Sequence, residues 1–278
     1  MPSPVPSHEL VEQLAAVREV ALGAGRLQTE GRQAMGAIDY KGATDMVTDV
    51  DRRVEAYLLR ELTRLFPDDG VRGEEGTAQP GRSGRTWIVD PLDGTTNYVH
   101  GHPFHCVSIA CADVDGPLLG AVHAPALDEM FLAVRDGGAR LERPRDGEAR
   151  DLRLGDGPPL QRALLATGFS YLRDDVCALN CDAMKAFLLA GCHGVRRAGS
   201  AALDLCHVGL GRLDGYWELR LNPWDCAAGG LVAREAGALV TDLHGGDDWL
   251  EWGWLLAAAP ALHAPMLQVI REVLGDAL

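Results

Sequence analysis

The sequence predicts a mixed α/β protein in which helices pack against β-sheets in two lobes. Three observations predict this class: helical spacing near the N-terminus, short alternating apolar runs in the middle, and alternating helix-like and strand-like segments beyond. With 278 residues, of which 47% are hydrophobic, the chain can bury a large core. We expect one domain over 1–278, with an N-terminal lobe over about 9–150 and a C-terminal lobe over about 151–278.

The N-terminal part should form two helices. Apolar residues recur at helical spacing over 9–33. A second helix should begin after Thr48, because Thr48 and Asp51 have the spacing of a capping box, and it should stop at Pro67. Asp51 would then lie in the first turn, where the helix dipole favours a carboxylate.

The rest of the chain alternates between strands and helices. Short alternating runs separated by Asp-Gly turns predict an antiparallel meander over 104–141. The charged, Gly- and Pro-containing stretch 142–159 is the expected seam between the lobes. Beyond it we expect a helix near 175–190, further strands and helices, a buried strand at WLLAAA and a last helix over 260–274.

Charge and composition exclude several functions. The formal net charge of −14 argues against a broad nucleic-acid or anionic-membrane surface. No apolar run approaches the ~18 residues that a membrane span needs. The seven scattered cysteines favour a reducing, cytoplasmic compartment. A zinc site at Cys177 and Cys181 is disfavoured because the cysteines lack short CxxC spacing.

One acidic motif, DPLDGTT at 90–96, directly follows the apolar run WIV. Asp90 and Asp93 would repel each other unless they face solvent, as in an ordinary turn, or share a cation. The Asp-Gly-Thr-Thr segment could also start a helix whose free N–H groups bind phosphate. Oxygen ligands beside a phosphate site indicate magnesium.

Two further acidic motifs strengthen this interpretation. Glu74 lies between glycines shortly before the same strand, and Asp225 follows Pro223-Trp224 at an expected helix start. Taken alone, Asp225 has the position of an ordinary residue in a helix-capping turn. An anionic substrate of so acidic a protein would need the positive charge that bound cations supply.

Together these motifs resemble the inositol monophosphatase family, part of the superfamily of magnesium-dependent, lithium-sensitive phosphatases. The resemblance rests on GEE at 73–75, WIVDPLDGTTNYVHG at 87–101, GSAALDL at 199–205, DGYWEL at 214–219 and PWDCAAGGLVAREAG at 223–237. It extends from about Lys41 to Asp242. It implies an α/β layered sandwich (α-β-α-β-α) of the inositol monophosphatase and fructose-1,6-bisphosphatase type, usually assembled as a homodimer.

The resemblance also implies roles for individual residues. One magnesium ion would be held by Glu74, Asp90 and the backbone carbonyl of Leu92, and a second by Asp90, Asp93 and Asp225. A third, weaker ion near Glu74 occurs in the family. Asp51 and Thr95 would orient the attacking water. The residues expected to contact the substrate are Asp93, Gly94 and Thr95 at the phosphate, and Gly199, Ser200, Ala201 and Glu218 at the alcohol half.

The implied activity is hydrolysis of inositol monophosphate, or a similar polyol phosphate, by metal-activated water. Histidinol phosphate, a sugar bisphosphate, NADP or a 3′-phosphoadenosine compound are alternative substrates for the same chemistry. An alternative of another class is a protein-binding role with the transcription machinery. Arg220 departs from relatives, which often have a small residue there. Its guanidinium could favour a second phosphate or carboxylate, or could face solvent or a partner subunit.

Overall fold

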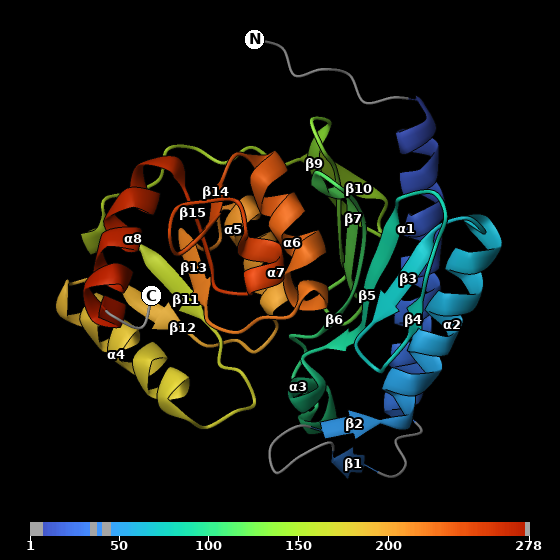
Figure 1. Cartoon of the computed structure of the whole chain (residues 1–278), viewed down its shortest axis with the longest axis horizontal. Coiled ribbons are helices and arrows are strands. Elements are labelled where there is room, and N and C mark those ends of the chain that lie inside the picture. The colour runs from blue at the N-terminus through green and yellow to red at the C-terminus, as the bar shows by residue number, and fades with distance from the viewer. Residues whose placement is uncertain (1–7, 34–37, 41–45, 276–278) are drawn as a thin grey trace.

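The computed structural model describes residues 8–33, 38–40 and 46–275. Helices and sheets alternate in five layers (Figure 1). From one side to the other these are α1 (His8–Gln33) with α2 (Asp49–Leu65), an eight-stranded sheet, α5 (Ala201–Leu210) with α6 (Pro223–Ala236), a five-stranded sheet, and α4 (Asp175–Leu189) with α8 (Pro260–Leu274). The layered α-β-α-β-α sandwich expected from the sequence is confirmed.

The eight-stranded sheet has the order β10-β9-β8-β7-β6-β5-β3-β4. Its strands are β3 (Gly70–Gly73), β4 (Ala78–Gln79), β5 (Thr86–Asp93), β6 (Cys106–Asp113), β7 (Gly116–Ala124), β8 (Glu129–Val134), β9 (Gly138–Arg143) and β10 (Glu148–Asp151). The run from β5 to β10 is antiparallel, as the sequence predicted for 104–141, whereas β3 and β5 are parallel.

The predicted seam at 142–159 begins too early. Residues up to Arg143 belong to β9, and 148–151 form the edge strand β10, so this charged stretch is still part of the sheet. All four residues of β10 are exposed. Charged side chains on an exposed edge strand oppose pairing with other chains, which explains a composition that resembles a linker. The division into lobes near 150 stays a prediction.

The five-stranded sheet has the order β12-β11-β13-β15-β14. Its strands are β11 (Leu164–Thr167), β12 (Gly194–Arg196), β13 (Gly215–Glu218), β14 (Leu239–Asp242) and β15 (Leu255–Ala258). The remaining elements are β1 (Ile38–Tyr40), β2 (Met46–Thr48), α3 (Thr95–His100), a 3-10 turn (Leu160–Arg162) and α7 (Trp249–Trp252).

The central helices α5 and α6 bury one face against each sheet. Ala202 and Ala228 join the apolar cluster of the larger sheet, whereas Leu205 and Cys226 join that of the smaller sheet. Gly229 allows the two helices to touch, because a Cβ there would lie 2.7 Å from the carbonyl oxygen of Ala202. This layer holds the smaller sheet in place against the larger one.

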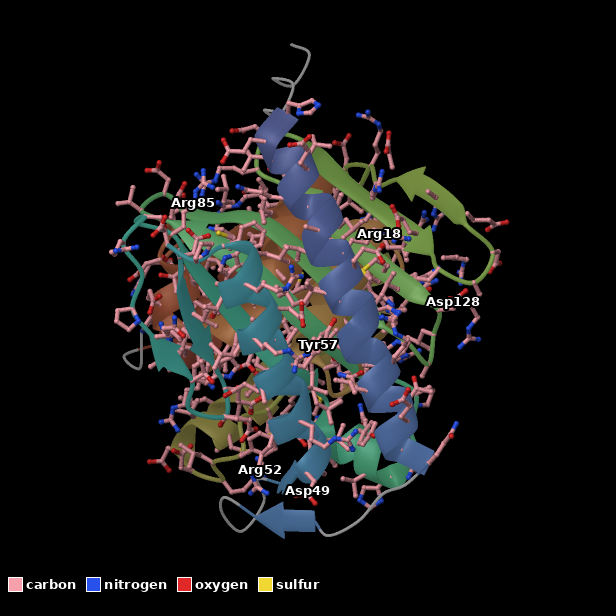
Figure 2. All side chains as sticks on the ribbon, turned by 90° about the vertical axis from the view of Figure 1, so that its right-hand side faces the viewer. Arg18, Asp49, Arg52, Tyr57, Arg85 and Asp128 are labelled. Atoms are coloured by element: carbon pink, nitrogen blue, oxygen red, sulfur yellow. The ribbon has the colours of Figure 1, made fainter. Side chains whose placement is uncertain are left out.

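The outer helices α1 and α2 run side by side over the larger sheet (Figure 2). Tyr57 of α2 lies against Gly23 of α1, where a Cβ would be only 1.9 Å from its hydroxyl oxygen. In the part of the chain that the structure describes, no helix combines the length and apolar character needed to cross a membrane.

Candidate active site

The acidic motif lies where β5 loses its regular pairing with β6. The register shifts between Asp90 and Asp93, so that two residues of β5 oppose one of β6. The buried amide of Gln28 on α1 fixes this bulge by donating to the carbonyl oxygens of Pro91 (2.8 Å) and Cys106 (3.1 Å). Pro91 itself has no N–H to donate. Both carboxylates are therefore carried by a rigid strand end rather than by a solvated turn.

Four carboxylates from three elements meet at this end of the sheet. Glu74 follows β3, which runs parallel to β5, so both strands end at the same edge. Glu74, Asp93 and Asp225 line one pocket of about 540 Å³. Asp90 is buried, and burial together with the charges of Glu74, Asp93 and Asp225 raises its pKa well above the ordinary value.

Two other carboxyl groups of the cluster, those of Asp93 and Asp225, also have raised pKa values. Burial and then the charges of Glu74 and Asp93 raise the pKa of Asp225 well above its ordinary value. Burial raises the pKa of Asp93 to about 6, against the opposing hydrogen bond from Ser200. A bound cation would remove this penalty, because positive charge favours the ionised carboxylates.

Within the described residues, no three His, Cys, Asp or Glu side chains form a closed metal-ligand cluster. Protein donors hold several of these carboxylate oxygens instead. Asp93 Oδ2 accepts from Ser200 Oγ (2.6 Å) and from the Ala202 N–H (2.8 Å). Asp225 Oδ2 accepts from the Asn222 N–H (2.7 Å). The donor set consists of hard oxygens crowded around one pocket, and it therefore fits magnesium.

Thr95 and Asp51 lie beneath the pocket as a buried pair. Thr95 Oγ1 is 3.1 Å from Asp51 Oδ1 and 3.0 Å from the Leu92 carbonyl oxygen. Asp51 Oδ2 accepts from the N–H (2.8 Å) and hydroxyl (2.5 Å) of Thr48, so the predicted capping box of α2 is present. Burial raises the pKa of Asp51, while hydrogen bonds from Thr48 and Thr95 oppose that rise.

Gly94 occupies a position that only glycine can fill. Its φ of 91° is in the left-handed region, and a Cβ would lie 3.0 Å from the Phe104 carbonyl oxygen and 3.1 Å from that of Gly199. Asn97 on α3 donates to the carbonyl oxygens of Phe104 (2.7 Å) and Ala198 (2.8 Å). These contacts bring the start of α3 against the loop before α5.

The same pocket is lined by the residues expected at the alcohol half of the substrate. They are Gly199, Ser200, Ala201 and Glu218, joined by the buried Asp204, which the sequence reasoning missed. Burial raises the pKa of Glu218 to about 7, although the Tyr216 hydroxyl donates to it. Gly168 follows β11, the strand paired with β13, and its lack of a side chain leaves room for this carboxylate, since a Cβ on Gly168 would lie 1.9 Å from Glu218 Oε2.

Glu55 is a second residue that the sequence reasoning missed. It lies on the buried face of α2, one turn after Asp51, and accepts from the N–H groups of Glu75 (2.7 Å) and Thr77 (3.2 Å) and from the Thr77 hydroxyl (2.7 Å). These bonds hold the loop that carries Glu74. The sequence signal was an acidic residue in phase with the apolar face of a helix.

Replacing Glu55 should weaken magnesium binding without removing a ligand. Glu55→Gln keeps the size of the side chain but places an amide N–H opposite the N–H and hydroxyl donors of the loop. The bonds that these donors make to the charged carboxylate, each worth ~1.5–3 kcal/mol, are therefore weakened or lost. We expect magnesium affinity, measured by titration calorimetry, to fall about tenfold or more. The control Glu61→Gln, at an ion-paired position facing Arg60 and Arg64 on the same helix, should leave it unchanged. Equal affinities of wild type and Glu55→Gln would contradict this role.

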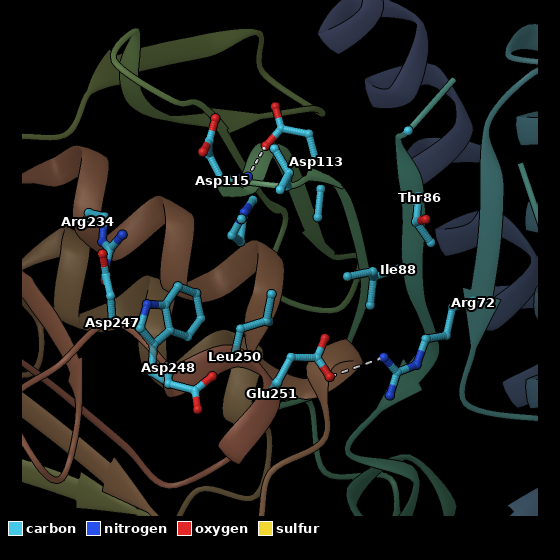
Figure 3. A pocket seen from close by; sticks show the side chains of 16 residues that line it. Arg72, Thr86, Ile88, Asp113, Asp115, Arg234, Asp247, Asp248, Leu250 and Glu251 are labelled. Atoms are coloured by element: carbon cyan, nitrogen blue, oxygen red, sulfur yellow. Dashed lines mark hydrogen bonds and ion pairs between the residues drawn. The ribbon is translucent and has the colours of Figure 1, made fainter. Parts of the chain in front are cut away.

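A larger groove of about 950 Å³ lies elsewhere, between the loop before α7 and the β6–β7 turn (Figure 3). Both arginines that line it are paired within the chain: Arg72 with Glu251 at 3.5 Å, and Arg234 with Asp247. Arg72 also lies over the ring of Trp224 and so separates this groove from the acidic pocket. None of the expected site residues is among those that line it, so the candidate site is the smaller pocket.

Comparisons with known proteins identify the family. The model of the inositol monophosphatase family matches residues 9–274. The Vibrio cholerae protein named Nus factor SuhB is 41% identical over 84% of this chain and 85% of its own length. The Synechocystis inositol-1-monophosphatase is 40% identical over 84% of this chain and 79% of its own length. The crystal structure of the extragenic suppressor protein suhB from Bartonella henselae superposes with a TM-score of 0.86 at 33% identity, covering 94% of this chain and 99% of that one.

Proposed function

Because the chain belongs to the inositol monophosphatase family, we propose that it is a magnesium-dependent phosphomonoesterase acting on inositol monophosphate or a similar polyol phosphate. The single observation that carries this proposal is the meeting of four carboxylates beside the start of α3. Glu74, Asp93 and Asp225 line the pocket with Gly94, and the charges of all three act on the buried Asp90.

In the proposed site, Glu74, Asp90 and the Leu92 carbonyl would hold one magnesium ion, and Asp90, Asp93 and Asp225 would hold a second. Bound magnesium supplies positive charge that stabilises the phosphoryl group and the leaving oxygen. This positive charge also explains how a protein with a net charge of −14 could bind an anionic substrate.

The attacking water is oriented by Thr95 and Asp51. The Thr95 hydroxyl can donate to Asp51 Oδ1, 3.1 Å away, and then accept a hydrogen bond from the water. Asp51 Oδ1 would take up the proton that the water passes on through Thr95. The buried setting that raises the pKa of Asp51 suits a carboxylate that must accept a proton. The N–H groups of Gly94 and Thr95 hold the phosphate oxygens.

Glu218 is proposed to accept hydrogen bonds from hydroxyl groups of the substrate. Glu218→Gln should lower kcat/KM for inositol monophosphate by roughly one to two orders of magnitude, since bonds to a charged group are worth ~1.5–3 kcal/mol. An aryl phosphate, which lacks those hydroxyls, should barely respond. Because the ligand-free pKa of Glu218 is about 7, kcat/KM for the polyol phosphate should rise with pH through that value. With magnesium saturating at every pH, so that its competition with protons does not contribute, this rise should be absent with the aryl phosphate and in Glu218→Gln.

Equal losses on both substrates in Glu218→Gln would mean that Glu218 supports the metal site rather than the alcohol half. Rates of phosphate release between about pH 6 and 8 for both substrates make this distinction.

Lithium should inhibit in competition with the second magnesium ion. A small monovalent cation can enter an oxygen cage made by Asp90, Asp93 and Asp225, but its single charge stabilises the leaving oxygen less. We expect phosphate release to fall in tens of millimolar lithium and to recover as magnesium is raised. Undiminished rates at such concentrations would remove lithium sensitivity from the proposal.

The substrate is tested by phosphate release from a panel of esters with and without magnesium. The panel contains inositol monophosphate, histidinol phosphate, a sugar bisphosphate, NADP and a 3′-phosphoadenosine compound. The proposal expects the highest kcat/KM for inositol monophosphate or a related polyol monophosphate. If the protein prefers one of the other four esters, that ester replaces inositol monophosphate as the proposed substrate. If magnesium causes phosphate release from none of them, the proposed activity is refuted.

A contact with the transcription machinery is a second candidate, favoured by the name Nus factor SuhB of the Vibrio cholerae relative. Copurification of the full chain with RNA polymerase from its own cells would support it, and no retention would oppose it.

We also propose that the chain forms a homodimer in the cytoplasm. All seven cysteines, each within the described residues, are free, which suits a reducing compartment. Analytical ultracentrifugation tests the dimer.

A further inference from the structure

Arg220 holds an unusual backbone conformation at the rim of the candidate site. It lies two residues after Glu218, the last residue of β13, and both side chains line the pocket. Its φ is 67°, in the left-handed region that glycine adopts far more readily than arginine. Such conformations persist only where surrounding contacts impose them. Buried Leu219 and Leu221 on either side hold the backbone here, and the Arg220 side chain forms an ion pair in which Nη1 donates to Asp174 Oδ2.

Asp174 links this ion pair to the wall of the pocket. Its other oxygen, Oδ1, caps α4 by accepting from the N–H groups of Val176 (3.1 Å) and Cys177 (3.4 Å). The five residues 168–172, which lead from β11 toward Asp174, line the pocket. One carboxylate therefore ties the start of α4, and the wall before it, to the end of β13.

The ion pair also determines which charges a substrate meets. Two guanidinium groups, those of Arg197 and Arg220, line the pocket. The charge of Arg197 acts on Glu218, whose pKa it lowers against the effect of burial. Arg220 is engaged by Asp174. A second phosphate or carboxylate on the substrate would have to compete with Asp174 for the charge of Arg220, whereas a neutral polyol competes with nothing.

We propose that the Arg220–Asp174 ion pair is a specificity element, which keeps the guanidinium occupied and so selects monophosphates of neutral polyols over bisphosphates. The inference rests on the proposed phosphatase function and refines its substrate class. It also revises the expectation from sequence that Arg220 would itself recruit a second anionic group.

The test is to release Arg220 while keeping the cap of α4. Asp174→Asn retains a side-chain oxygen that can accept from the N–H of Val176, and its amide nitrogen then faces the guanidinium, donor to donor. We expect the ratio of kcat/KM for an inositol bisphosphate to that for inositol monophosphate to rise about threefold to fivefold, mainly through a lower KM for the bisphosphate, because an ion pair between partly exposed side chains is weak. The aryl phosphate should respond little, because the groups around the phosphate are untouched.

Three variants serve as controls. Arg220→Gly suits the left-handed backbone but lacks the guanidinium, so neither it nor Asp174→Asn/Arg220→Gly should gain activity on the bisphosphate. Asp175→Asn removes a neighbouring charge in the first turn of α4 and should behave as wild type. An unchanged ratio in Asp174→Asn, or an equal gain in the double variant, would overturn the proposal.

Binding separates this inference from the proposed function. The increase in melting temperature caused by each inositol phosphate, measured with magnesium in wild type and Asp174→Asn, reports selectivity without turnover. If wild type hydrolyses none of the three esters, the proposed function is wrong. The specificity role of the ion pair is then judged by binding alone: the bisphosphate should raise the melting temperature of Asp174→Asn more than that of wild type. An equal increase in both proteins would overturn the inference.

Discussion

Asp225→Asn is expected to lower kcat for phosphate release by roughly 10²- to 10³-fold while leaving the fold intact. The carboxylate is proposed to hold the magnesium ion that stabilises the leaving oxygen, and the amide supplies a weaker, uncharged ligand. The helix start should survive, because an asparagine oxygen can still accept from the Asn222 N–H, as Asp225 Oδ2 does at 2.7 Å. Asp93→Asn should have a similar effect on turnover.

The matched control is Asp115→Asn, which removes the same charge from the larger groove of Figure 3. Its rate of phosphate release should equal that of wild type, as should the circular dichroism spectra of all variants in the absence of metal. The metal-free melting temperatures of Asp225→Asn and Asp93→Asn should be no lower than that of wild type, because each substitution removes one charge from the crowded cluster. Turnover by Asp225→Asn within a few-fold of wild type would remove this residue from the catalytic site.

Magnesium should stabilise the protein, and the effect should grow with pH. Without metal, the pKa values of Asp90, Asp93 and Asp225 are raised, that of Asp93 to about 6. A carboxyl group whose folded pKa exceeds its unfolded pKa adds stability that is fully present below the unfolded pKa and is lost as pH rises through the folded pKa. The metal-free cluster therefore destabilises the fold increasingly from about pH 4 upward, and magnesium competes with protons for the same oxygens.

At about 100 times its Kd, magnesium should add ~2.7 kcal/mol to the free energy of unfolding near pH 7.5, or about 5–10 °C in melting temperature. The shift should be clearly smaller near pH 5, where protons occupy the carboxylates. Differential scanning calorimetry at both pH values, with a chelator as the control, measures it. A shift that is absent, or as large at pH 5 as at pH 7.5, would count against magnesium binding by this cluster.

Much of the fold could be predicted because local patterns and tertiary structure agree. The last helix was expected over 260–274 and forms α8 at those residues, where Pro260 begins it. The antiparallel meander and the start of α2 after Thr48 followed from turn residues and capping. The family recognised from the motifs is confirmed by the match over residues 9–274. Edge strand β10 was not predicted, because its exposed, mostly charged residues have the composition of a linker between lobes.

The candidate site was predictable only where its residues lie in continuous motifs. Gln28, Glu55 and Asn97 position the motifs through bonds to partners 63, 20 and 101 residues away. No local pattern records such contacts, because they arise only once the layers have packed. The same holds for Arg220, whose partner Asp174 is 46 residues away. The departure at Arg220 was visible in the sequence, but its engagement by Asp174 was not.

The most direct test of the metal-dependent phosphatase is the initial rate of phosphate release from inositol monophosphate by metal-stripped protein as magnesium is returned. Chelation should abolish the rate, and magnesium should restore it along a saturable curve in wild type but not in Asp225→Asn. A metal-stripped protein that hydrolyses the ester at the full rate would contradict the central claim.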